Sequence, residues 1–247
     1  MAILRVGFFA KSIQKQTNMT VVLPEDTEKA GPYPVLYLLH GLSDDDTIWA
    51  RRTSIERYVA GMPLIVVMPD SGRGFYTDAK RGPAYESHIM KDVLGFMDRF
   101  FPTIPERRGR VIGGLSMGGY GSMKLALKHP DCFCSVAAHS SVFDMARSLL
   151  RPERTEELSL IFGDDPAVGD NDVLRLAEQI DRKLLPAIRF DCGMDDWLIQ
   201  DNRAFHQHLA KLGIEHEYAE FPGGHEWGYW DAHIQEALKF HARALGI

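Results

Sequence analysis

Short apolar runs alternate with longer segments of helical periodicity along this chain of 247 residues. Four of the runs are largely apolar without alternating, which is typical of strands covered on both faces in the middle of a parallel sheet. They are Val35–Leu39, Leu64–Met68, Val111–Gly114 and Ser135–Ala138. Two runs near the start predict an antiparallel pair of strands, and two later runs predict further strands of the sheet. In chain order these are Val6–Ala10, Met19–Leu23, Ile188–Cys192 and Glu217–Phe221.

Helical periodicity fills most of the intervals between these runs. The segments are Thr47–Ala60, Tyr85–Phe100, Gly119–Lys128, Val173–Lys183, Asp201–Leu212 and Trp230–Leu245. Because strand, helix and strand repeat so often, we expect crossover units and an α/β protein. The predicted architecture is a doubly wound, mostly parallel sheet with antiparallel N-terminal strands and helices on both faces.

No repeat, low-complexity tract or linker divides this alternation, and we predict a single domain over residues 1–247. One irregular segment, about residues 143–172, is too long for a simple connection. We interpret it either as a small insertion over the carboxyl edge of the sheet, where ligands bind in open α/β folds, or as a surface excursion without a role. The pattern does not decide between the two.

Charge narrows the range of partners. Thirty-four acidic residues against 28 basic ones give a formal net charge of −6. An acidic chain without a block of like charges lacks the basic face that nucleic acids and anionic membranes require, so we expect neither as a partner. The apolar runs are far shorter than the ~20 residues of a membrane helix. No small-residue cleavage site follows the short apolar run near the start, and we expect no signal peptide there.

The three cysteines are too few and too scattered to form a disulfide framework. Cys132, Cys134 and Cys192 also lack the spacing typical of a zinc site. We therefore expect three buried, reduced thiols, no metal and a cytoplasmic location.

The most informative residues form the motif Gly114-Leu115-Ser116-Met117-Gly118, which matches G-x-S-x-G. An apolar run precedes it and a helical pattern follows it, as a sharp strand-to-helix turn requires. Side chains two positions before and two after the serine would collide with the chain in such a turn, and glycine relieves both collisions. The turn lifts the Ser116 hydroxyl out of the sheet at a helix amino terminus, so Ser116 is the predicted nucleophile.

A serine nucleophile needs a base, and position selects one among ten histidines. His225 follows the last predicted strand, where a loop can swing an imidazole over the sheet edge. His40 follows an early strand and is expected to shape a loop, and His139 follows the strand after the serine and is a candidate for the pocket wall. Histidines inside helical patterns are interpreted as surface or packing residues: His206, His208, His233 and His241.

The remaining parts of the predicted site come from two further loops. The run Ile188–Cys192 ends in two adjacent aspartates that compete for the position beside His225, and we favour Asp196 over Asp195. The oxyanion of the tetrahedral intermediate is expected to accept hydrogen bonds from the backbone N–H groups of Met117 and Leu42. The glycine before Leu42 is expected to permit the unusual backbone angle that turns this N–H inward.

A run of three aspartates, Asp44, Asp45 and Asp46, invites a metal interpretation, since hard cations bind carboxylate clusters. No glycine and glutamate of an EF-hand loop follow it. We interpret the run as the amino-terminal cap of the predicted helix that begins at Thr47. A cluster at this place is expected to repel anionic substrates.

Aromatic residues gather near the predicted strand ends and the His225 loop, and they either wall a substrate pocket or belong to the core. They are Phe75, Tyr76, Trp197, Trp227, Tyr229 and Trp230. Among the residues singled out, the candidates for substrate contact are His40, Tyr76, His139, Trp197 and Trp227.

Together these features resemble the Putative esterase family of α/β-hydrolases, which includes esterase D (S-formylglutathione hydrolase), tributyrin, acetyl, feruloyl and acetylxylan esterases, and mycolyltransferases. The resemblance spans nearly the whole chain. It includes Met19–Pro24, Leu36–Gly41, Trp49–Tyr58, Gly74–Asp78, Gly114–Gly119, Cys192–Asp196, Gly223–Trp227 and Tyr229-Trp230. It is greatest to compact bacterial tributyrin-esterase-like members, and it implies the α/β-hydrolase fold with Ser116, Asp196 and His225 as the triad. Leu115 and the absence of a cysteine-containing insert after Gly41 depart from the esterase D branch.

The resemblance and the residues together predict a serine carboxylesterase that hydrolyses short-chain acyl esters through an acyl-enzyme, without a cofactor. The expected partner is a small ester substrate, and the sequence leaves the oligomeric state open, a homo-oligomer included. Four alternatives stay open: a thioesterase of the S-formylglutathione hydrolase type, a feruloyl or acetylxylan esterase, an acyltransferase with the same triad, and a non-catalytic binding protein.

Overall fold

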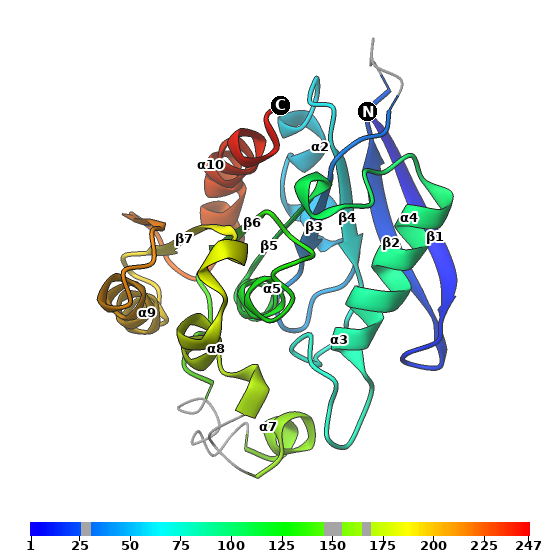
Figure 1. Cartoon of the computed structure of the whole chain (residues 1–247). Coiled ribbons are helices and arrows are strands. Elements are labelled where there is room, and N and C mark those ends of the chain that lie inside the picture. The colour runs from blue at the N-terminus through cyan, green and yellow to red at the C-terminus, as the bar shows by residue number, and fades with distance from the viewer. Residues whose placement is uncertain (26–30, 146–154, 165–168) are drawn as a thin grey trace.

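An eight-stranded sheet runs through the protein in the computed structural model, which describes residues 1–25, 31–145, 155–164 and 169–247 (Figure 1). The strands are β1 (Ala2–Ala10), β2 (Lys15–Leu23), β3 (Val35–Leu39), β4 (Ile65–Pro69), β5 (Arg110–Leu115), β6 (Ser135–His139), β7 (Ala187–Gly193) and β8 (Glu217–Phe221). Across the sheet their order is β1-β2-β4-β3-β5-β6-β7-β8. The strand β2 pairs antiparallel with β1 and β4, and the other pairings are parallel. The predicted mostly parallel sheet with antiparallel N-terminal strands is confirmed.

The centre of the sheet contains the place where successive connections turn in opposite directions. From β3 the chain passes to β4 on one side and then to β5 on the other. Ligands of open α/β sheets bind outside the carboxyl ends of the strands at such a switch point. Every position of β3, β4 and β6 is buried, which explains why these strands are apolar without alternation.

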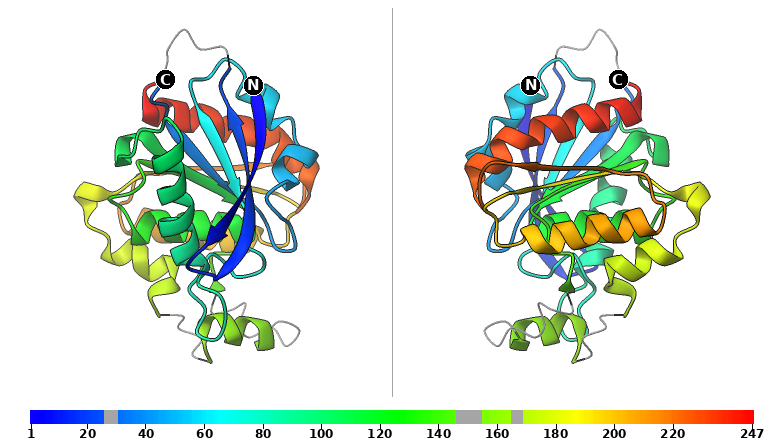
Figure 2. Two further views of the ribbon diagram at one scale, coloured as in Figure 1. Left: turned by 90° about the vertical axis from the view of Figure 1, so that its right-hand side faces the viewer. Right: turned by 90° about the vertical axis from the view of Figure 1, so that its left-hand side faces the viewer.

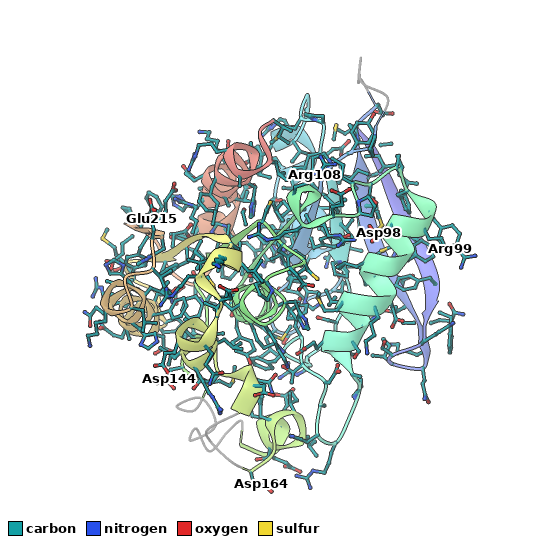
Figure 3. All side chains as sticks on the ribbon, in the orientation of Figure 1. Asp98, Arg99, Arg108, Asp144, Asp164 and Glu215 are labelled. Carbon is teal, nitrogen blue, oxygen red and sulfur yellow. The ribbon has the colours of Figure 1, made fainter. Side chains whose placement is uncertain are left out.

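Helices cover both faces of the sheet, as predicted. One face packs against α1 (Ile48–Arg52), α2 (Ile55–Tyr58) and α10 (Trp227–Leu245). The other face packs against α4 (Leu94–Phe100), α5 (Met117–Lys128), α8 (Val173–Gln179) and α9 (Ile199–Lys211). Figure 2 views the sheet from its two edges, with α10 on one side and α5 and α9 on the other. Asp98 of α4, labelled in Figure 3, pairs with Arg110 at the start of β5.

Two predicted helices are broken into shorter pieces. The expected helix Thr47–Ala60 separates into α1 and α2 at Thr53, whose backbone is extended. The Thr53 hydroxyl donates to the Trp49 carbonyl oxygen at 2.6 Å and accepts from the Ile55 N–H at 3.2 Å. It thereby competes with the helical hydrogen bonds. The expected helix Tyr85–Phe100 consists of α3 (Tyr85–Ser87), a π-helical segment η1 (His88–Val93) and α4.

The irregular segment at about residues 143–172 contains one described helix and one short turn. The helix α7 (Thr155–Phe162) projects from the rest of the molecule in both views of Figure 2. The turn η3 (Gly169–Asn171) leads into α8. Two parts of the segment, residues 146–154 and 165–168, lie outside the described residues. Two further short turns are η2 (Arg107–Gly109) and η4 (Arg182–Leu184).

Among the described residues, no helix is both long and apolar enough to cross a membrane. All three cysteines are free thiols. Cys192 is buried in β7, but Cys132 and Cys134 are only half-buried. The expectation of three buried thiols is therefore wrong for these two, which lie in the turn before β6 rather than in the strand.

Candidate active site

Ser116 occupies the turn between β5 and α5. Its backbone lies at φ 52° and ψ −115°, a left-handed conformation that is strained for a residue with a side chain. The Ser116 N–H donates to the His139 carbonyl oxygen at 2.9 Å, which ties the turn to the end of the neighbouring strand β6. The residue is 8% exposed. Ser116 thus stands at the edge of the sheet with its hydroxyl near solvent.

Steric crowding explains the glycines on either side of Ser116. A Cβ atom on Gly114 would lie 2.6 Å from the Gly118 carbonyl oxygen, and one on Gly118 would lie 2.5 Å from the His40 carbonyl oxygen. Real side chains do not tolerate such contacts with backbone atoms. The close approach of β5, α5 and the loop after β3 therefore requires glycine at both positions.

A chain of two hydrogen bonds links Ser116 to a buried carboxylate. The Nε2 atom of His225 lies 3.1 Å from the Ser116 Oγ atom, and its Nδ1 atom lies 2.9 Å from Oδ2 of Asp196. Because a carboxylate can only accept, the Nδ1 atom carries the proton and Nε2 is free to accept one from the serine. Asp196 and His225, which follow Ser116 by 80 and 109 residues in the sequence, thus lie beside it at the carboxyl edge of the sheet.

The environment of Asp196 keeps it ionised. Burial, with 2% of the residue exposed, would by itself raise the pKa of this carboxyl. The hydrogen bonds from His225 and from the Leu198 N–H, the latter at 2.8 Å, outweigh burial and bring the pKa below its ordinary value. The neighbouring Asp195 is exposed. Of the two candidates, the structure brings Asp196 to His225.

Two tryptophan rings hold the His225 imidazole in place. The Trp230 ring stands perpendicular to it, with centroids 5.0 Å apart, and the Trp197 ring lies 5.2 Å away. The Trp230 indole N–H donates to Ser140 Oγ at 3.2 Å, which fixes the tryptophan in turn. The loop that carries His225 is therefore bounded by aromatic rings on two sides.

The predicted oxyanion donors, the backbone N–H groups of Leu42 and Met117, belong to two segments that adjoin Ser116. Met117 is the first residue of α5, where helical N–H groups have no acceptor within the helix. Leu42 lies in the loop after β3 and shares the cleft wall with Ser116. Neither N–H donates to another group within the described part of the chain.

The reason for a glycine at position 41 differs from the expected one. Gly41 has no positive φ; the left-handed residue of this loop is Ser43, at φ 73°. A Cβ atom on Gly41 would instead lie 2.6 Å from the side chain of Leu115. The glycine is needed for close approach of the loop to the strand that carries Ser116, and the expectation of an unusual backbone angle is wrong.

Three of the five residues expected to contact substrate are buried instead. His40 and His139 are 1% exposed and Tyr76 is fully buried, so they support the site from behind its surface. His40 Nδ1 bonds to the Gly41 carbonyl oxygen at 2.7 Å, and the Tyr76 hydroxyl donates to the His40 carbonyl oxygen at 2.9 Å. Burial raises the pKa of Tyr76 far above its ordinary value, so the hydroxyl remains a donor.

The sequence patterns also did not predict a polar network that lies behind the Ser116 turn and joins β6, β7 and α10. His139 Nδ1 lies 3.0 Å from Oδ1 of Asp191 in β7, and the Tyr229 hydroxyl donates to the same oxygen at 2.9 Å. The signal available was weak, because an aspartate inside an apolar strand indicates burial without indicating its partner.

A cleft of about 550 Å³ opens at Ser116 and His225. Its walls are residues 41–44 of the loop after β3, Leu115, residues 226–227 after His225, and the rings of Trp197 and Trp230. Trp197 and Trp227, both predicted to contact substrate, line it. Asp44 and Glu226 also line it; the aspartate run was expected beside the oxyanion loop, whereas Glu226 was not singled out.

The three aspartates after the oxyanion loop have separate roles. Asp45 accepts from the Thr47 N–H at 2.9 Å, but Thr47 is itself the N-cap of α1, so Asp45 closes the turn before the helix and the predicted cap by the aspartate run is wrong. Asp46 is buried and accepts from the Thr20 hydroxyl at 2.9 Å, and Asp44 faces the cleft. Within the described ranges, no three His, Cys, Asp or Glu side chains group to hold a metal.

The fold and the strained serine turn define an α/β-hydrolase, and comparisons with known proteins place it more closely. Residues 10–241 match the model of the family described as Putative esterase, and the chain belongs to this family. It is a carboxylic-ester hydrolase. The predicted family and enzyme class are both confirmed.

Similar proteins are esterases and serine hydrolases. An acetyl esterase of Caldicellulosiruptor saccharolyticus is 28% identical over 98% of this chain and 99% of its own length. Among solved structures, the Staphylococcus aureus fluorophosphonate-binding serine hydrolase FphF is 31% identical, with a TM-score of 0.89 over 97% of this chain and 98% of its own. An S-formylglutathione hydrolase (FrmB) from Staphylococcus aureus is also 31% identical, with a TM-score of 0.82 over the same shares.

Proposed function

We propose that this esterase is a serine carboxylesterase that hydrolyses short-chain acyl esters through an acyl-enzyme. One observation carries the proposal: an unbroken chain of hydrogen bonds from Ser116 Oγ through His225 to Asp196 at the mouth of the cleft. The likeness to an acetyl esterase over almost the whole of both chains supports a small acyl group.

In the proposed mechanism Ser116 Oγ attacks the ester carbonyl carbon while His225 Nε2 takes the hydroxyl proton. Asp196 stabilises the imidazolium that forms, and the N–H groups of Leu42 and Met117 stabilise the negative carbonyl oxygen. The C–O bond to the alcohol then breaks, and His225 returns its proton to the leaving alcohol. Water, deprotonated by His225, attacks the acyl-enzyme and releases the carboxylic acid and free Ser116.

Replacing the nucleophile tests this assignment. We expect Ser116→Ala to lower kcat for p-nitrophenyl acetate by about 10⁵–10⁶-fold and to abolish labelling by a fluorophosphonate probe. The matched control is Ser12→Ala, in the turn between β1 and β2, which should retain both. Turnover by Ser116→Ala close to that of the unaltered protein would overturn the assignment, and failure of the unaltered protein to label would favour a non-catalytic binding protein.

A substrate panel tests the acyl group and the reaction type. We expect kcat/KM to fall from p-nitrophenyl acetate and butyrate to the octanoate, and to be lower for methyl ferulate, acetylated xylan and S-formylglutathione. The likeness to an S-formylglutathione hydrolase makes the last substrate the main competitor. Added alcohols that divert the acyl group from water into new esters would identify an acyltransferase instead.

We further propose that the segment of residues 143–172 is a small insertion that influences substrate selection. The proposal is supported by Arg73, which bridges this segment and the cleft wall. Its guanidinium bonds Glu157 of α7 at 2.5 and 2.8 Å and donates to the Ser43 hydroxyl at 2.7 Å. A displacement of α7 would therefore act on the loop that supplies Leu42.

A further inference from the structure

The walls of the cleft combine indole rings with carboxylates. Trp197, Trp227 and Trp230 supply the aromatic surface, and Trp197 is 48% exposed at the opening. Trp227 packs edge-on against Trp230, with ring centroids 5.2 Å apart, and against Trp49 of α1 at 5.3 Å. Trp227 and Trp230 are thus packed against other indole rings before any substrate arrives.

The charged side chains on these walls are all acidic. Asp44 and Glu226 line the cleft, and no lysine or arginine does among the residues that form it. Glu226 is exposed, and among the described residues its carboxylate has neither an ion pair nor a hydrogen bond. Glu226 therefore has no counter-ion within the described ranges, and it lies one residue from His225.

Two arginines of the described residues, Arg51 and Arg73, lie close to this wall, and each is paired with a carboxylate outside it. Arg73, which touches Ser43, forms a two-point pair with Glu157. Arg51 in α1 lies 3.6 Å from the carboxylate of Asp45. The formal net charge of the whole chain, −6, has the same sign as the charged side chains of the wall. Among the described residues, the side chains that line the cleft therefore carry a negative formal charge.

We propose that this cleft selects esters by the charge of their alcohol part and prefers cationic alcohols, quaternary ammonium alcohols above all, to neutral or anionic ones. The inference rests on the proposed function and adds a substrate class to it. Asp44 and Glu226 are the residues that determine this specificity, together with the indole of Trp197.

Two physical effects act in the same direction on such a substrate. A cation over an indole face is attracted by the negative charge of the ring's π system, and a quaternary ammonium has little hydration to lose. Carboxylates around a concave site raise the local concentration of cations and lower that of anions, and salt screens this effect. S-formylglutathione carries a net negative charge, so the same wall disfavours it.

Three acetate esters with alcohols of similar size separate charge from shape. They are acetylcholine, its uncharged analogue 3,3-dimethylbutyl acetate, and the anionic 2-sulfonatoethyl acetate, and one assay of released acetate serves for all three. Each kcat/KM is divided by the rate of hydrolysis by hydroxide, which removes differences in leaving-group reactivity. We expect the cationic ester to exceed the neutral one by about tenfold at low salt, the effect of roughly one favourable charge interaction.

Salt provides a test on the unaltered protein. Raising the salt from about 0.02 M to 0.5 M should lower kcat/KM for acetylcholine, raise it for the anionic ester and leave the neutral ester almost unchanged. Equal salt dependence of all three esters would contradict the proposal without any need for a variant.

Isosteric variants identify the residues. In Asp44→Asn, Glu226→Gln and the double variant, the ratio of kcat/KM for acetylcholine to that for 3,3-dimethylbutyl acetate should fall, by about tenfold in the double variant. Glu215→Gln is the matched control: it removes the same charge before β8, at the opposite end of the strands from the cleft, and should leave the ratio unchanged (Figure 3).

The outcomes separate this inference from the proposed function. A ratio that stays constant in the double variant overturns the charge selection, even if every ester is hydrolysed. Absence of acetate release from all three esters and from p-nitrophenyl acetate would instead overturn the proposed esterase mechanism.

Discussion

Asp195 and Asp196 are adjacent in the sequence but have opposite environments. Asp196 is buried and receives hydrogen bonds from His225 and the Leu198 N–H, whereas Asp195 is exposed. We expect Asp196→Asn to lower kcat for p-nitrophenyl acetate by about 10⁴-fold, because the amide stabilises the wrong tautomer of His225. Asp195→Asn should stay within about twofold. A comparable loss in both variants, or a loss in Asp195→Asn alone, would contradict the proposed role.

The neighbouring sequence predicts the structural position of some site residues but not of others. Ser116 could be located because local crowding between Gly114 and Gly118 leaves a readable motif. The wall of the cleft could not be read in this way. Tyr76 and Trp197 are both aromatic residues near strand ends, yet one is fully buried and the other is 48% exposed. Burial of this kind depends on which elements pack together, and no short motif records it.

At the scale of elements, a buried lysine ties together the helix that begins beside Ser116 and the segments around it. Lys124 of α5 is fully buried, and its Nζ donates to the Tyr76 carbonyl oxygen at 2.7 Å and to Glu86 of α3 at 3.0 Å. Burial lowers the pKa of Lys124 to about 8 against the opposing attraction of Glu86. The link holds α5 to the chain after β4, about two helical turns from the nucleophile.

Breaking this link from its two ends should have unequal effects. Glu86→Gln removes the carboxylate that is hydrogen-bonded to the buried Lys124 cation, and we expect it to lower the free energy of unfolding by about 3–5 kcal/mol. Lys124→Met leaves Glu86 paired with Lys128 at 3.1 Å and His129 at 3.0 Å, so its effect should be smaller. Urea unfolding measures both.

A surface pair serves as the control for this comparison. Glu106 and Arg108 form an exposed ion pair at 2.8 Å, and Glu106→Gln should change stability by no more than about 0.5 kcal/mol. If Lys124→Met proved the more destabilising of the two buried changes, the account of Glu86 as the essential counter-ion would be wrong.

The elements themselves could be predicted well where periodicity and burial agree. Glu217–Phe221 and Val35–Leu39 were predicted to the residue as strands. The break between α1 and α2 was missed because it comes from the side chain of Thr53 and from Asp231 of α10, which accepts from the Ser54 N–H at 2.9 Å. A partner 177 residues away leaves no trace in a local pattern.

At the scale of the whole molecule, buried histidines make stability depend on pH. Burial, assisted by the charges of His139 and Arg189, lowers the pKa of His241 to about 3. Its unfolded value is about 6.5. Between these pH values the unfolded chain binds a proton that the folded chain excludes, so stability is fully present above pH ~6.5 and is lost as the pH falls. Burial also lowers the pKa of His88 and His216, which act in the same direction.

This linkage predicts a measurable slope. His241 alone should make the free energy of unfolding fall by about 1.4 kcal/mol for each pH unit below pH ~6, and His88 and His216 should act in the same direction. In His241→Gln the slope should be flatter by up to this amount, as measured by urea unfolding at several pH values between about 7.5 and 4.5. A variant with the slope of the unaltered protein would show that His241 does not titrate in this way.

The single-domain organisation predicted for residues 1–247 stays a proposal, which one continuous sheet through the described residues supports. The prediction was strongest for the parallel centre, where each strand must be apolar on both faces. It was weakest for the segment 143–172, because a surface excursion has neither periodicity nor a required burial.

The order of the site residues along the chain has a consequence for the protein during its synthesis. Ser116 is made 80 residues before Asp196 and 109 before His225, and α10 follows directly after them. On the proposed mechanism, a nascent chain that has already formed the Ser116 turn but lacks His225 has an unactivated serine hydroxyl, which is a poor nucleophile. Reactivity arises only when translation has supplied the last loop. The growing polypeptide therefore has no activated serine that could be acylated before synthesis reaches that loop.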